Sequence, residues 1–306
     1  MLIFFLFALA FACPRELKAE TTDGLGMWVW SGSSYSTESA RQDLVRFCLR
    51  HDIRHLDIHG NLVWAGGDPL LEDSQGLREM ILLAGHHRIT TAIIRGEPRM
   101  FFLQNHDRAM RELRAILAFS RTLPSGARFK GIKYDVEPYG TQEWKGGGTA
   151  RESIMRDYLE FLRRAHSVLD EEQPSLWLAA DTPFWWDRDE FILSFNGQRK
   201  RFSEHVQDTT DFIAIMSYWR NPERVLASVE GERSYAEKIR KFVHPSVETI
   251  QLKKDPLTTF YGAPVEDFWQ TVHYLQERAK EDPSLGGVRI HCYRGLKDKL
   301  GNPNPQ

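Results

Sequence analysis

Short apolar runs alternate with amphipathic segments along the chain between residues 26 and 293. In each unit, an apolar run of strand length precedes a loop and then a segment with apolar residues at helical spacing. Segment 38–50 shows the second half of a unit, because Leu44, Val45 and Cys48 fall on one helical face and Thr37 can cap the first turn. The alternation predicts strands that are each followed by a helix.

Eight such units follow the first apolar segment of the chain. The predicted helices cover 38–50, 76–87, 107–120, 151–169, 202–206, 235–242 and 265–280. The predicted strands cover 26–30, 55–59, 91–97, 129–137, 176–181, 211–219, 247–252 and 287–293. Eight strand–helix units are typical of a (β/α)8 barrel, and no strand is followed by the Gly-x-Gly-x-x-Gly turn of a dinucleotide-binding fold. We therefore predict a single-domain (β/α)8 barrel over residues 20–300 with a frayed tail at 301–306.

Charge and composition exclude two classes of protein. The 306 residues include 40 Lys and Arg against 42 Asp and Glu, without a long run of either sign, so a nucleic-acid partner is not expected. Aromatic residues make up 12% of the chain, which excludes a disordered protein. Nine tryptophans are a high number for this length, and each offers a flat apolar face with one hydrogen-bond donor.

The first segment has the character of a targeting sequence. Residues 2–12 are apolar but too few to span a bilayer, and a small residue, Ala19, follows at a suitable distance for cleavage. We predict a signal peptide at 1–19 and a secreted or periplasmic protein, with a buried N-terminal helix as the alternative. The pattern predicts no other membrane span. Cys48 and Cys292 then remain, and we expect free thiols and a monomer.

The end of the fourth predicted strand carries three ionisable residues on one face. Side chains in a strand alternate between its two faces, and barrel active sites lie at the carboxyl ends of the strands. In 131–137 this rule points Lys133, Asp135 and Glu137 inward. Lys133 beside Asp135 is expected to lower the pKa of that carboxyl and keep it charged. A buried Lys133–Asp135 ion pair that only supports the barrel is the alternative.

The other predicted strands also end in polar or aromatic residues. Glu248 belongs to this inward set only if Val247 and Thr249 face the helices. Flat indole rings stack on sugar rings and carboxylates bind sugar hydroxyls, so the pattern favours a glycan-binding mouth. The substrate-binding candidates beside Lys133 are Trp28, Trp30, Asp57, His59, Arg95, Glu97, Asp181, Trp185, Met216, Trp219, His291 and Tyr293. Seven tryptophans are predicted to line this face of the barrel: Trp28, Trp30, Trp64, Trp144, Trp185, Trp186 and Trp219.

Two of these strands resemble motifs of the family 18 glycoside hydrolases, the chitinase-type barrels. Residues 130–137 resemble the family's Asp-Gly-x-Asp-x-Asp-x-Glu on strand four, and 215–218 resemble its Met-x-Tyr-Asp on strand six. The resemblance implies that Glu137 protonates the glycosidic oxygen, that Asp135 orients an N-acetyl group of the substrate and that Tyr218 hydrogen-bonds near that group.

This chain departs from the family pattern at four positions. Lys130 and Lys133 stand where the family has Asp, Trp219 stands where it has Asp after the Tyr, and His291 stands where it commonly has Trp. The family's pair of proton-sharing Asp residues is therefore missing from this strand. The resemblance implies a divergent member whose preference for N-acetyl sugars is open.

Three alternatives remain at this point. Val136-Glu137-Pro138 also resembles the Asn-Glu-Pro of retaining barrel glycosidases, in which case Glu248 is the nucleophile and Glu137 the acid. A sugar-binding barrel without catalysis is the second alternative, and a metal-dependent hydrolase that uses Asp57, His59 and His291 is the third. The favoured prediction is a secreted hydrolase that cleaves glycosidic bonds in a polysaccharide or oligosaccharide, with Glu137 as general acid and without a cofactor or metal.

Overall fold

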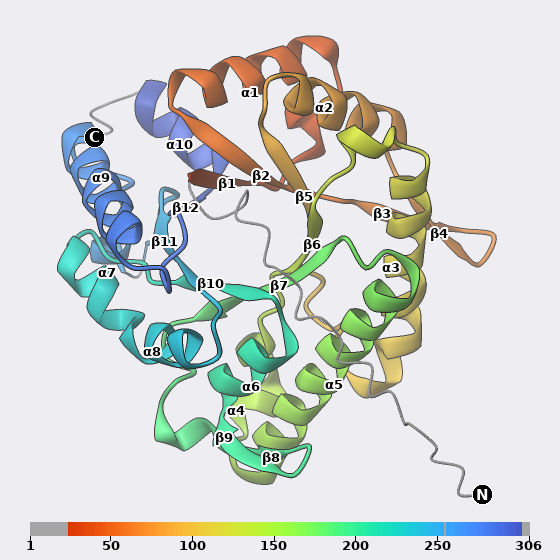
Figure 1. Ribbon diagram of the computed structural model, residues 1–306, viewed down its shortest axis with the longest axis vertical. Coiled ribbons are helices and arrows are strands. Elements are labelled where there is room, and N and C mark those ends of the chain that lie inside the picture. The colour runs from red at the N-terminus through yellow and green to blue at the C-terminus, as the bar shows by residue number, and fades with distance from the viewer. Residues whose placement is uncertain (1–23, 254, 302–306) are drawn as a thin grey trace, which may run out of the picture.

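The computed structural model describes residues 24–253 and 255–301 and confirms the single-domain (β/α)8 barrel. Eight parallel strands close into a ring, which Figure 1 shows at the centre of the molecule. In ring order these strands are β1 (Leu25–Val29), β2 (Ile53–His59), β5 (Thr90–Arg95), β6 (Gly131–Tyr134), β7 (Trp177–Pro183), β10 (Phe212–Met216), β11 (Val243–Glu248) and β12 (Arg289–His291).

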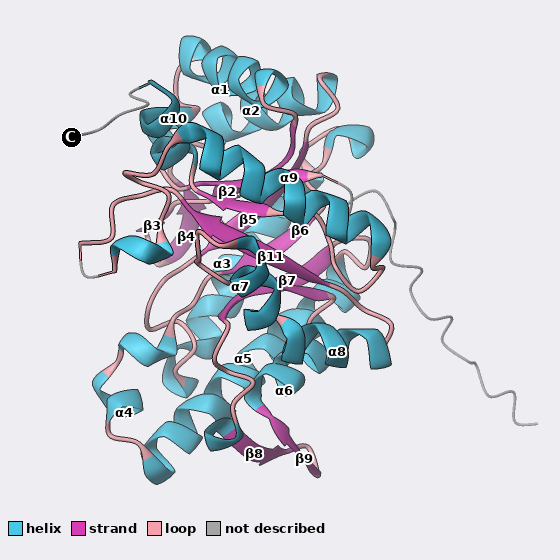
Figure 2. Cartoon of the chain, turned by 90° about the vertical axis from the view of Figure 1, so that its left-hand side faces the viewer, coloured by secondary structure: helices cyan, strands magenta, loops and turns pink. Residues whose placement is uncertain are grey.

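The main helices cover the outside of this ring, as Figure 2 shows from the side. They bury their apolar faces against the strands and leave their charged faces in water. These helices are α1 (Glu38–Arg50), α2 (Ser74–His86), α3 (His106–Arg121), α5 (Gly148–Glu172), α6 (Phe202–Thr209), α8 (Glu230–Lys238), α9 (Val265–Glu281) and α10 (Tyr293–Gly301).

Additional short elements follow the carboxyl ends of four strands. A hairpin of β3 (Leu62–Ala65) and β4 (Asp68–Leu71) follows β2, and a second hairpin of β8 (Ile192–Phe195) and β9 (Gln198–Arg201) follows β7. The helices α4 (Gln142–Lys145) and α7 (Pro222–Ser228) follow β6 and β10. These insertions belong to the loops that surround the barrel mouth.

The first helix has the bounds that the sequence predicts. The predicted helix of the sixth unit and the predicted strand of the seventh differ from the structure. Helix α1 spans Glu38–Arg50, and the Thr37 hydroxyl accepts the Ala40 N–H at 3.2 Å. The predicted helix 235–242 ends early because Arg240 takes a left-handed conformation with φ of 57°. The predicted strand 247–252 starts earlier, at Val243, because Pro245 lies inside the strand and interrupts its pattern in the sequence.

The amino-terminal half of the barrel interior is filled by large side chains that two glycines accommodate. A Cβ atom at Gly26 would lie 2.6 Å from Arg289 Cδ, and one at Gly131 would lie 2.0 Å from the Trp177 ring. Arg289 Nη2 also contacts His244 Nε2 at 3.0 Å, and burial lowers the pKa of Arg289 to about 10. The lower interior is thus closed, and polar chemistry accessible to a ligand lies toward the carboxyl ends of the strands.

Three sequence predictions concern the chain ends, the thiols and the membrane. The predicted leader 1–19 and residues 302–306 of the predicted tail lie outside the described residues, while Gly301 is the last residue of α10. Cys48 and Cys292 are both buried and free, as expected. Among the helices of the described ranges, none combines the length and apolar character that a membrane crossing requires.

Candidate active site

Lys133 lies at the centre of a buried ionic cluster below the barrel mouth. Its Nζ atom is 2.9 Å from Asp57 Oδ2 and 2.8 Å from Asp181 Oδ1, and all three side chains are 1% exposed. The ammonium group also lies 3.9 Å from the centre of the Trp28 ring, whose Nε1 donates to Asp181 Oδ2 at 2.9 Å. These four side chains point into the barrel, as the strand period of two predicts.

The two carboxyl groups of this cluster differ in their affinity for protons. Burial acts to raise the pKa of Asp57, but Lys133 and His55, whose Nε2 is 2.9 Å from Asp57 Oδ1, hold that pKa well below its usual range. Burial raises the pKa of Asp181 to about 6, with Lys133 opposing the shift and the negative charge of Asp57 adding to it. The cluster therefore carries one fixed anion and one carboxyl that titrates near neutral pH.

Asp135 does not pair with Lys133, which corrects the sequence-based expectation. The Lys133 ammonium group is held by Asp57 and Asp181, while Asp135 Oδ1 is buried without a hydrogen-bond partner among the described residues. Burial, followed by the negative charges of Asp181 and Glu137, raises the pKa of Asp135 well above its usual range. The carboxyl expected to be charged is thus one that holds a proton.

Glu137 lies just beyond the end of β6 at the rim of the mouth, where its side chain is exposed. The Tyr139 hydroxyl donates to Glu137 Oε1, and the Tyr139 ring packs edge-on against Trp185 at a centroid distance of 5.3 Å. Burial and the charge of Glu137 raise the pKa of Tyr139, so the phenol remains a donor. The rim therefore presents a solvent-accessible carboxyl whose orientation is fixed by a neighbouring phenol.

Glu248 ends β11 on the other side of the mouth and is fully engaged by donors. Its Oε1 accepts the backbone N–H groups of Thr249 at 2.7 Å and Ile250 at 2.8 Å, and its Oε2 lies 2.8 Å from His291 Nδ1. Trp30 Nε1 donates to His291 Nε2 at 2.9 Å. Because an indole nitrogen can only donate, this pattern assigns the imidazole proton to Nδ1, which donates to Glu248.

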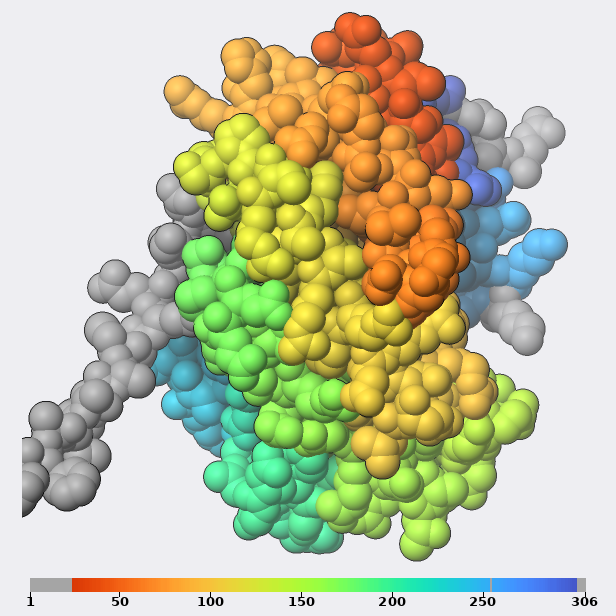
Figure 3. Space-filling view, turned by 90° about the vertical axis from the view of Figure 1, so that its right-hand side faces the viewer, coloured from red at the N-terminus to blue at the C-terminus, as the bar shows by residue number. Residues whose placement is uncertain are grey.

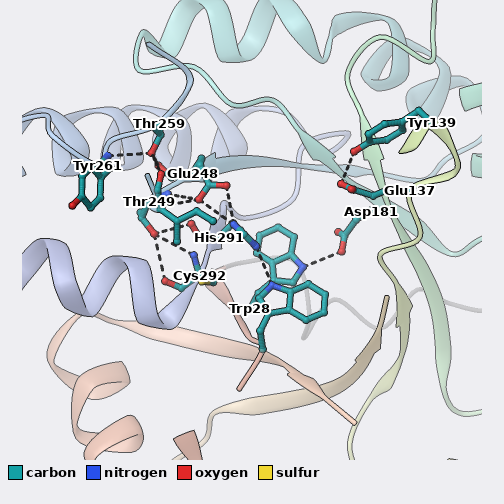
Figure 4. A network of polar contacts seen from close by, with 12 residues as sticks. Trp28, Glu137, Tyr139, Asp181, Glu248, Thr249, Thr259, Tyr261, His291 and Cys292 are labelled. Atoms are coloured by element: carbon teal, nitrogen blue, oxygen red, sulfur yellow. Dashed lines mark hydrogen bonds and ion pairs between the residues drawn. The ribbon is translucent and has the colours of Figure 1, made fainter. Parts of the chain in front are cut away.

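Tyr218 connects the two sides of the mouth. Its ring stacks on His291 at a centroid distance of 6.2 Å. Burial raises the pKa of Tyr218 well above its usual value, and the negative charges of Glu248, Asp135 and Asp181 add to that effect. Figure 4 shows Glu137 and Glu248 on opposite sides, with Trp28, Asp181 and His291 between them. The structure thus brings all four predicted catalytic residues, Glu137, Asp135, Tyr218 and Glu248, to one mouth.

Two further candidates, His59 and Met216, lie at the ends of their strands around this mouth. His59 packs against Trp30 with ring centroids 5.5 Å apart, and burial lowers the pKa of His59 to about 4, with the charge of Arg95 contributing. Met216 is half-buried at the end of β10, where its backbone pairs with Pro183. His59 is therefore uncharged at neutral pH.

The orientation predicted for Arg95 is wrong. Arg95 points away from the barrel interior and donates to Glu112 Oε2 of α3 and to the Gly60 carbonyl, both at 2.9 Å. The inward residue at this level is Ile94, which clusters with Trp28. The prediction assigned Arg95 to the inward face because a charged residue at the end of a barrel strand is typical of an active site. Its carboxylate partner lies instead on the helix that follows. Glu97 is exposed in the loop after β5.

Tyr293 also lies away from the mouth. The chain turns after His291, so that Tyr293 becomes the first residue of α10 and is buried against Phe47 of α1 with ring centroids 5.2 Å apart. The predicted eighth strand 287–293 was too long by two residues at this end, and that error placed Tyr293 on the inward face.

The tryptophans do not form one continuous lining, which corrects the prediction for seven of them. Trp28 and Trp30 lie in the mouth, and Trp185 is half-buried beside Tyr139. Trp144 and Trp186 are buried together with Phe202, Phe191 and Tyr158, where they anchor the loops after β6 and β7 to α5 and α6. Trp219 packs on Phe184 and carries Arg224 over its ring, and Trp64 belongs to the β3–β4 hairpin.

The residues of the proposed metal set are separately engaged by protein groups. Asp57 is bound by Lys133 and His55, and both ring nitrogens of His291 are used by Trp30 and Glu248. Within 24–253 and 255–301, no group of three or more His, Cys, Asp or Glu side chains is arranged to hold a metal ion. Asp57, His59 and His291 are therefore not brought together as a set of ligands.

Two functional side chains were missed by the sequence analysis. Tyr139 fixes Glu137, and the available signal was an aromatic residue two positions after the acid in a strand-end loop. His55 supports Asp57 from below, and the signal was its inward position two residues before Asp57 on the same strand. Both act on residues that the sequence had already identified.

Known proteins resemble this chain in fold rather than in sequence. No family model matches the sequence, and no curated protein matches it. Among solved structures, the β-mannanase of the blue mussel Mytilus edulis superimposes with a TM-score of 0.58 at 9% identity, covering 92% of this chain and 91% of the mannanase. The fold similarity therefore extends over nearly the whole barrel.

Two other solved structures resemble the chain to a comparable extent. The exo-β-1,4-mannosidase of Opitutaceae bacterium strain TAV5 gives a TM-score of 0.59 at 10% identity and covers 91% of this chain and 55% of that enzyme. A GH20 catalytic module of the pneumococcal exo-β-D-N-acetylglucosaminidase gives 0.54 at 10% identity, with 90% and 80% covered. These three structures are glycoside hydrolases, and they do not single out family 18.

Proposed function

We propose that the protein is a glycoside hydrolase that cleaves a polysaccharide or oligosaccharide, with Glu137 as general acid. The proposal is supported mainly by the positions of Glu137 and Glu248, which lie on opposite sides of one barrel mouth with aromatic side chains between them. Glu248 accepts hydrogen bonds from two backbone N–H groups and from His291, whereas burial raises the pKa of Asp135, the neighbour of Glu137. Acid-assisted glycoside cleavage uses one carboxyl that donates a proton and a second carboxyl, negatively charged, across the sugar.

Glu137 occupies the position from which a glycosidic oxygen is accessible. Its side chain is exposed at the rim, and Tyr139 fixes one carboxyl oxygen while leaving the other free. Asp135 lies two residues earlier, and the negative charge of Glu137 is one of the causes that raise the pKa of Asp135. In this mechanism Glu137 delivers the proton to the leaving oxygen, and Asp135, which holds a proton, can donate it to Glu137 afterwards.

Glu248 supplies the opposing negative charge. An oxocarbenium-like transition state carries positive charge at the anomeric carbon, and a fixed carboxylate stabilises that charge or attacks the carbon directly. Three donors bind Glu248, and its side chain is 3% exposed, so the carboxylate is held in place at the end of β11. Trp30, which is half-buried in the mouth, provides an apolar face for the sugar. Both the covalent route and the substrate-assisted route of family 18 use Glu137 as the acid.

The test is hydrolysis of end-labelled β-1,4-mannan, xylan, cello- and chito-oligosaccharides by the wild type and by Glu137→Gln. The variant keeps the shape of the side chain but has no proton to donate, so we expect kcat to fall by about 10²- to 10⁴-fold on the substrate that the wild type cleaves. Glu152→Gln is the matched control, because Glu152 is an exposed carboxylate of α5 paired with Arg156. The control is expected to cleave like the wild type.

Two results would overturn the proposal. One is an unchanged kcat in Glu137→Gln. The other is tight binding of an oligosaccharide by both proteins without cleavage of any substrate, which identifies a sugar-binding barrel instead of an enzyme.

We also propose that the protein is exported, on the basis of the apolar run 2–12 and the small residue Ala19. A polysaccharide substrate outside the cell is consistent with that location. The test is amino-terminal sequencing of the protein recovered from the culture medium or periplasm, where we expect the chain to begin at Glu20. Recovery of the full-length chain from the cytoplasm alone would contradict export.

A further inference from the structure

A cleft of about 500 Å³ lies beside the mouth, on the side of β2 and β5. Its walls are the ends of these two strands, the β3–β4 hairpin and the first turns of α3. In Figure 3 the hairpin, in orange, lies against the yellow segment that contains α3. A cavity of this volume falls in the range of sites that bind small molecules or single sugar units.

The cleft adjoins the candidate active site directly. His59 lines the cleft and packs against Trp30 of the mouth with ring centroids 5.5 Å apart. Gly96 also lines the cleft, and a Cβ atom at that position would lie 2.8 Å from the Asp135 carbonyl oxygen and 3.3 Å from the Trp30 ring. A glycan bound across the mouth therefore has room to extend into the cleft within one or two sugar units.

The charged groups of the cleft leave guanidinium donors available. Arg95, Arg99 and Arg108 line it together with two carboxylates, Glu97 and Glu112. Glu112 is buried and already accepts hydrogen bonds from Arg95 at 2.9 Å, Trp64 at 3.0 Å and Arg108 Nε at 3.4 Å. One carboxylate thus serves two arginines, the buried Arg95 and Arg108, whose side chain is 63% exposed, so their two positive charges are not fully balanced.

The donors that remain belong to three arginines. Arg95 Nε is a buried donor without a hydrogen-bond partner in the described part of the chain, and Arg95 is 7% exposed. The Nη atoms of Arg108 make no hydrogen bond within the described ranges, and its Cζ atom lies 4.7 Å from the centre of the Trp64 ring. Arg99 stacks on Phe102 at 4.4 Å, and its closest carboxylate, Glu143, is 3.6 Å away at the exposed rim.

We propose that this cleft binds an acidic unit of the glycan, in which a carboxylate or sulfate group is held by Arg99 and Arg108. Guanidinium groups form paired, charge-assisted hydrogen bonds with planar or tetrahedral oxyanions. The first turn of α3 lines the same cleft and adds the partial positive charge of a helix amino terminus. Glu97, exposed and without a protein partner among the described residues, accepts hydroxyl groups of the same sugar. The inference rests on the proposed function, since it assigns the substrate class of that site.

The test measures binding rather than hydrolysis, in the Glu137→Gln background. Calorimetry compares three β-1,4-linked tetrasaccharides that are neutral, carry one uronic acid or carry one sulfate. We expect at least one acidic ligand to bind about tenfold or more tightly than the neutral ligand at low salt, with the advantage shrinking as salt rises. The carboxylate and sulfate arms identify which oxyanion the cleft prefers.

Arg99→Gln and Arg108→Gln are each expected to remove most of that advantage and to leave the affinity for the neutral ligand within about twofold. Arg114→Gln is the matched control, because Arg114 lies on the same helix but pairs with Glu172 outside the cleft. Equal affinities for the three ligands, or an advantage that survives both substitutions, would overturn the inference. A protein that prefers acidic ligands but never hydrolyses a glycan would refute the proposed function and leave this inference standing.

Discussion

The carboxyl groups on the two sides of the barrel mouth differ in how many hydrogen-bond donors surround them. On the β11–β12 side, Glu248 accepts two backbone N–H groups and the His291 Nδ1–H, and His291 is held in turn by Trp30. On the β6–β7 side, Asp135 has a buried oxygen without a partner among the described residues, and burial with neighbouring carboxylates raises its pKa. One side surrounds its carboxylate with hydrogen-bond donors, and the other buries a carboxyl whose pKa is raised.

The difference shows how one barrel gives similar side chains different chemistry. Donors that are fixed by the backbone favour the charged form of a carboxyl, whereas low solvent access and nearby negative charge favour the neutral form. On the proton-holding side, Lys133 forms ion pairs with Asp57 and Asp181 but not with Asp135, where its positive charge only partly opposes the rise in pKa. The following substitutions test each part of this contrast.

Lys133→Met is expected to have the largest effect, on stability. It leaves Asp57 and Asp181 buried without their shared cation, so we expect the free energy of unfolding to fall by about 3–5 kcal/mol at pH 7 in urea titrations. The loss should shrink toward pH 4, where carboxyls of the unfolded chain also take up protons. Lys200→Met, which breaks a partly exposed pair with Asp208, is the control and is expected to cost less than about 1 kcal/mol. A loss in Lys133→Met that is small or independent of pH would contradict this role.

Asp135→Asn removes the protonated neighbour of the general acid. The amide cannot pass a proton to Glu137, so we expect kcat to fall by about 10²- to 10³-fold on the substrate of the wild type. Glu152→Gln again serves as control. An Asp135→Asn variant with near-normal kcat would show that the proton-holding side is not used in the reaction.

The same substitution predicts a specific pH dependence of stability. A carboxyl whose pKa is raised in the folded state binds more protons there than in the unfolded chain, so its contribution to stability falls as pH rises from about 4 through the raised value. Asp181, with a pKa of about 6, acts in the same direction between about pH 4 and 6. Asp135→Asn should therefore gain stability relative to the wild type between pH 4 and 8. Thermal unfolding across this range measures the difference, and a constant offset would refute it.

His291→Phe tests the charged side of the mouth. It removes the side-chain donor to Glu248 but leaves the two backbone donors, so we expect a smaller loss of kcat, about 10- to 100-fold. His291→Asn, which keeps an N–H near the position of Nδ1, should recover most of that activity. If the Asn and Phe variants are equally impaired, the ring supports the mouth by packing on Tyr218 rather than by donating to Glu248.

The fold and the membership of the mouth could be predicted because both follow from local periodicity. Eight strand–helix units imply a closed barrel, and the period of two places Trp28, Asp57, Lys133 and Asp181 in its interior. The partners of these groups could not be predicted in the same way. Lys133 was matched with Asp135, its neighbour in sequence, but its long side chain crosses the interior to Asp57 on β2 and Asp181 on β7.

Other predictions were wrong where a side chain after or at the end of a strand packs against the outer helices instead of the barrel mouth. Arg95 resembled a mouth residue because its partner, Glu112, is 17 positions away on the outer helix. Trp144 and Trp186 follow strand ends like the mouth tryptophans but are buried under the β6 and β7 loops. Strand position alone does not distinguish a side chain that reaches the ligand from one that packs its loop against a helix.

Tyr139→Phe is expected to have the smallest effect on kcat, and it tests the Glu137 side of the mouth alone. It removes the hydroxyl that donates to Glu137 and keeps the ring that packs against Trp185. We expect kcat to fall only about 3- to 10-fold, because one hydrogen bond to a partly exposed carboxyl is lost. Because His291→Phe acts on the opposite side, the two losses of kcat should multiply in the double variant. A combined loss much smaller than that product would show that the two sides act as one unit.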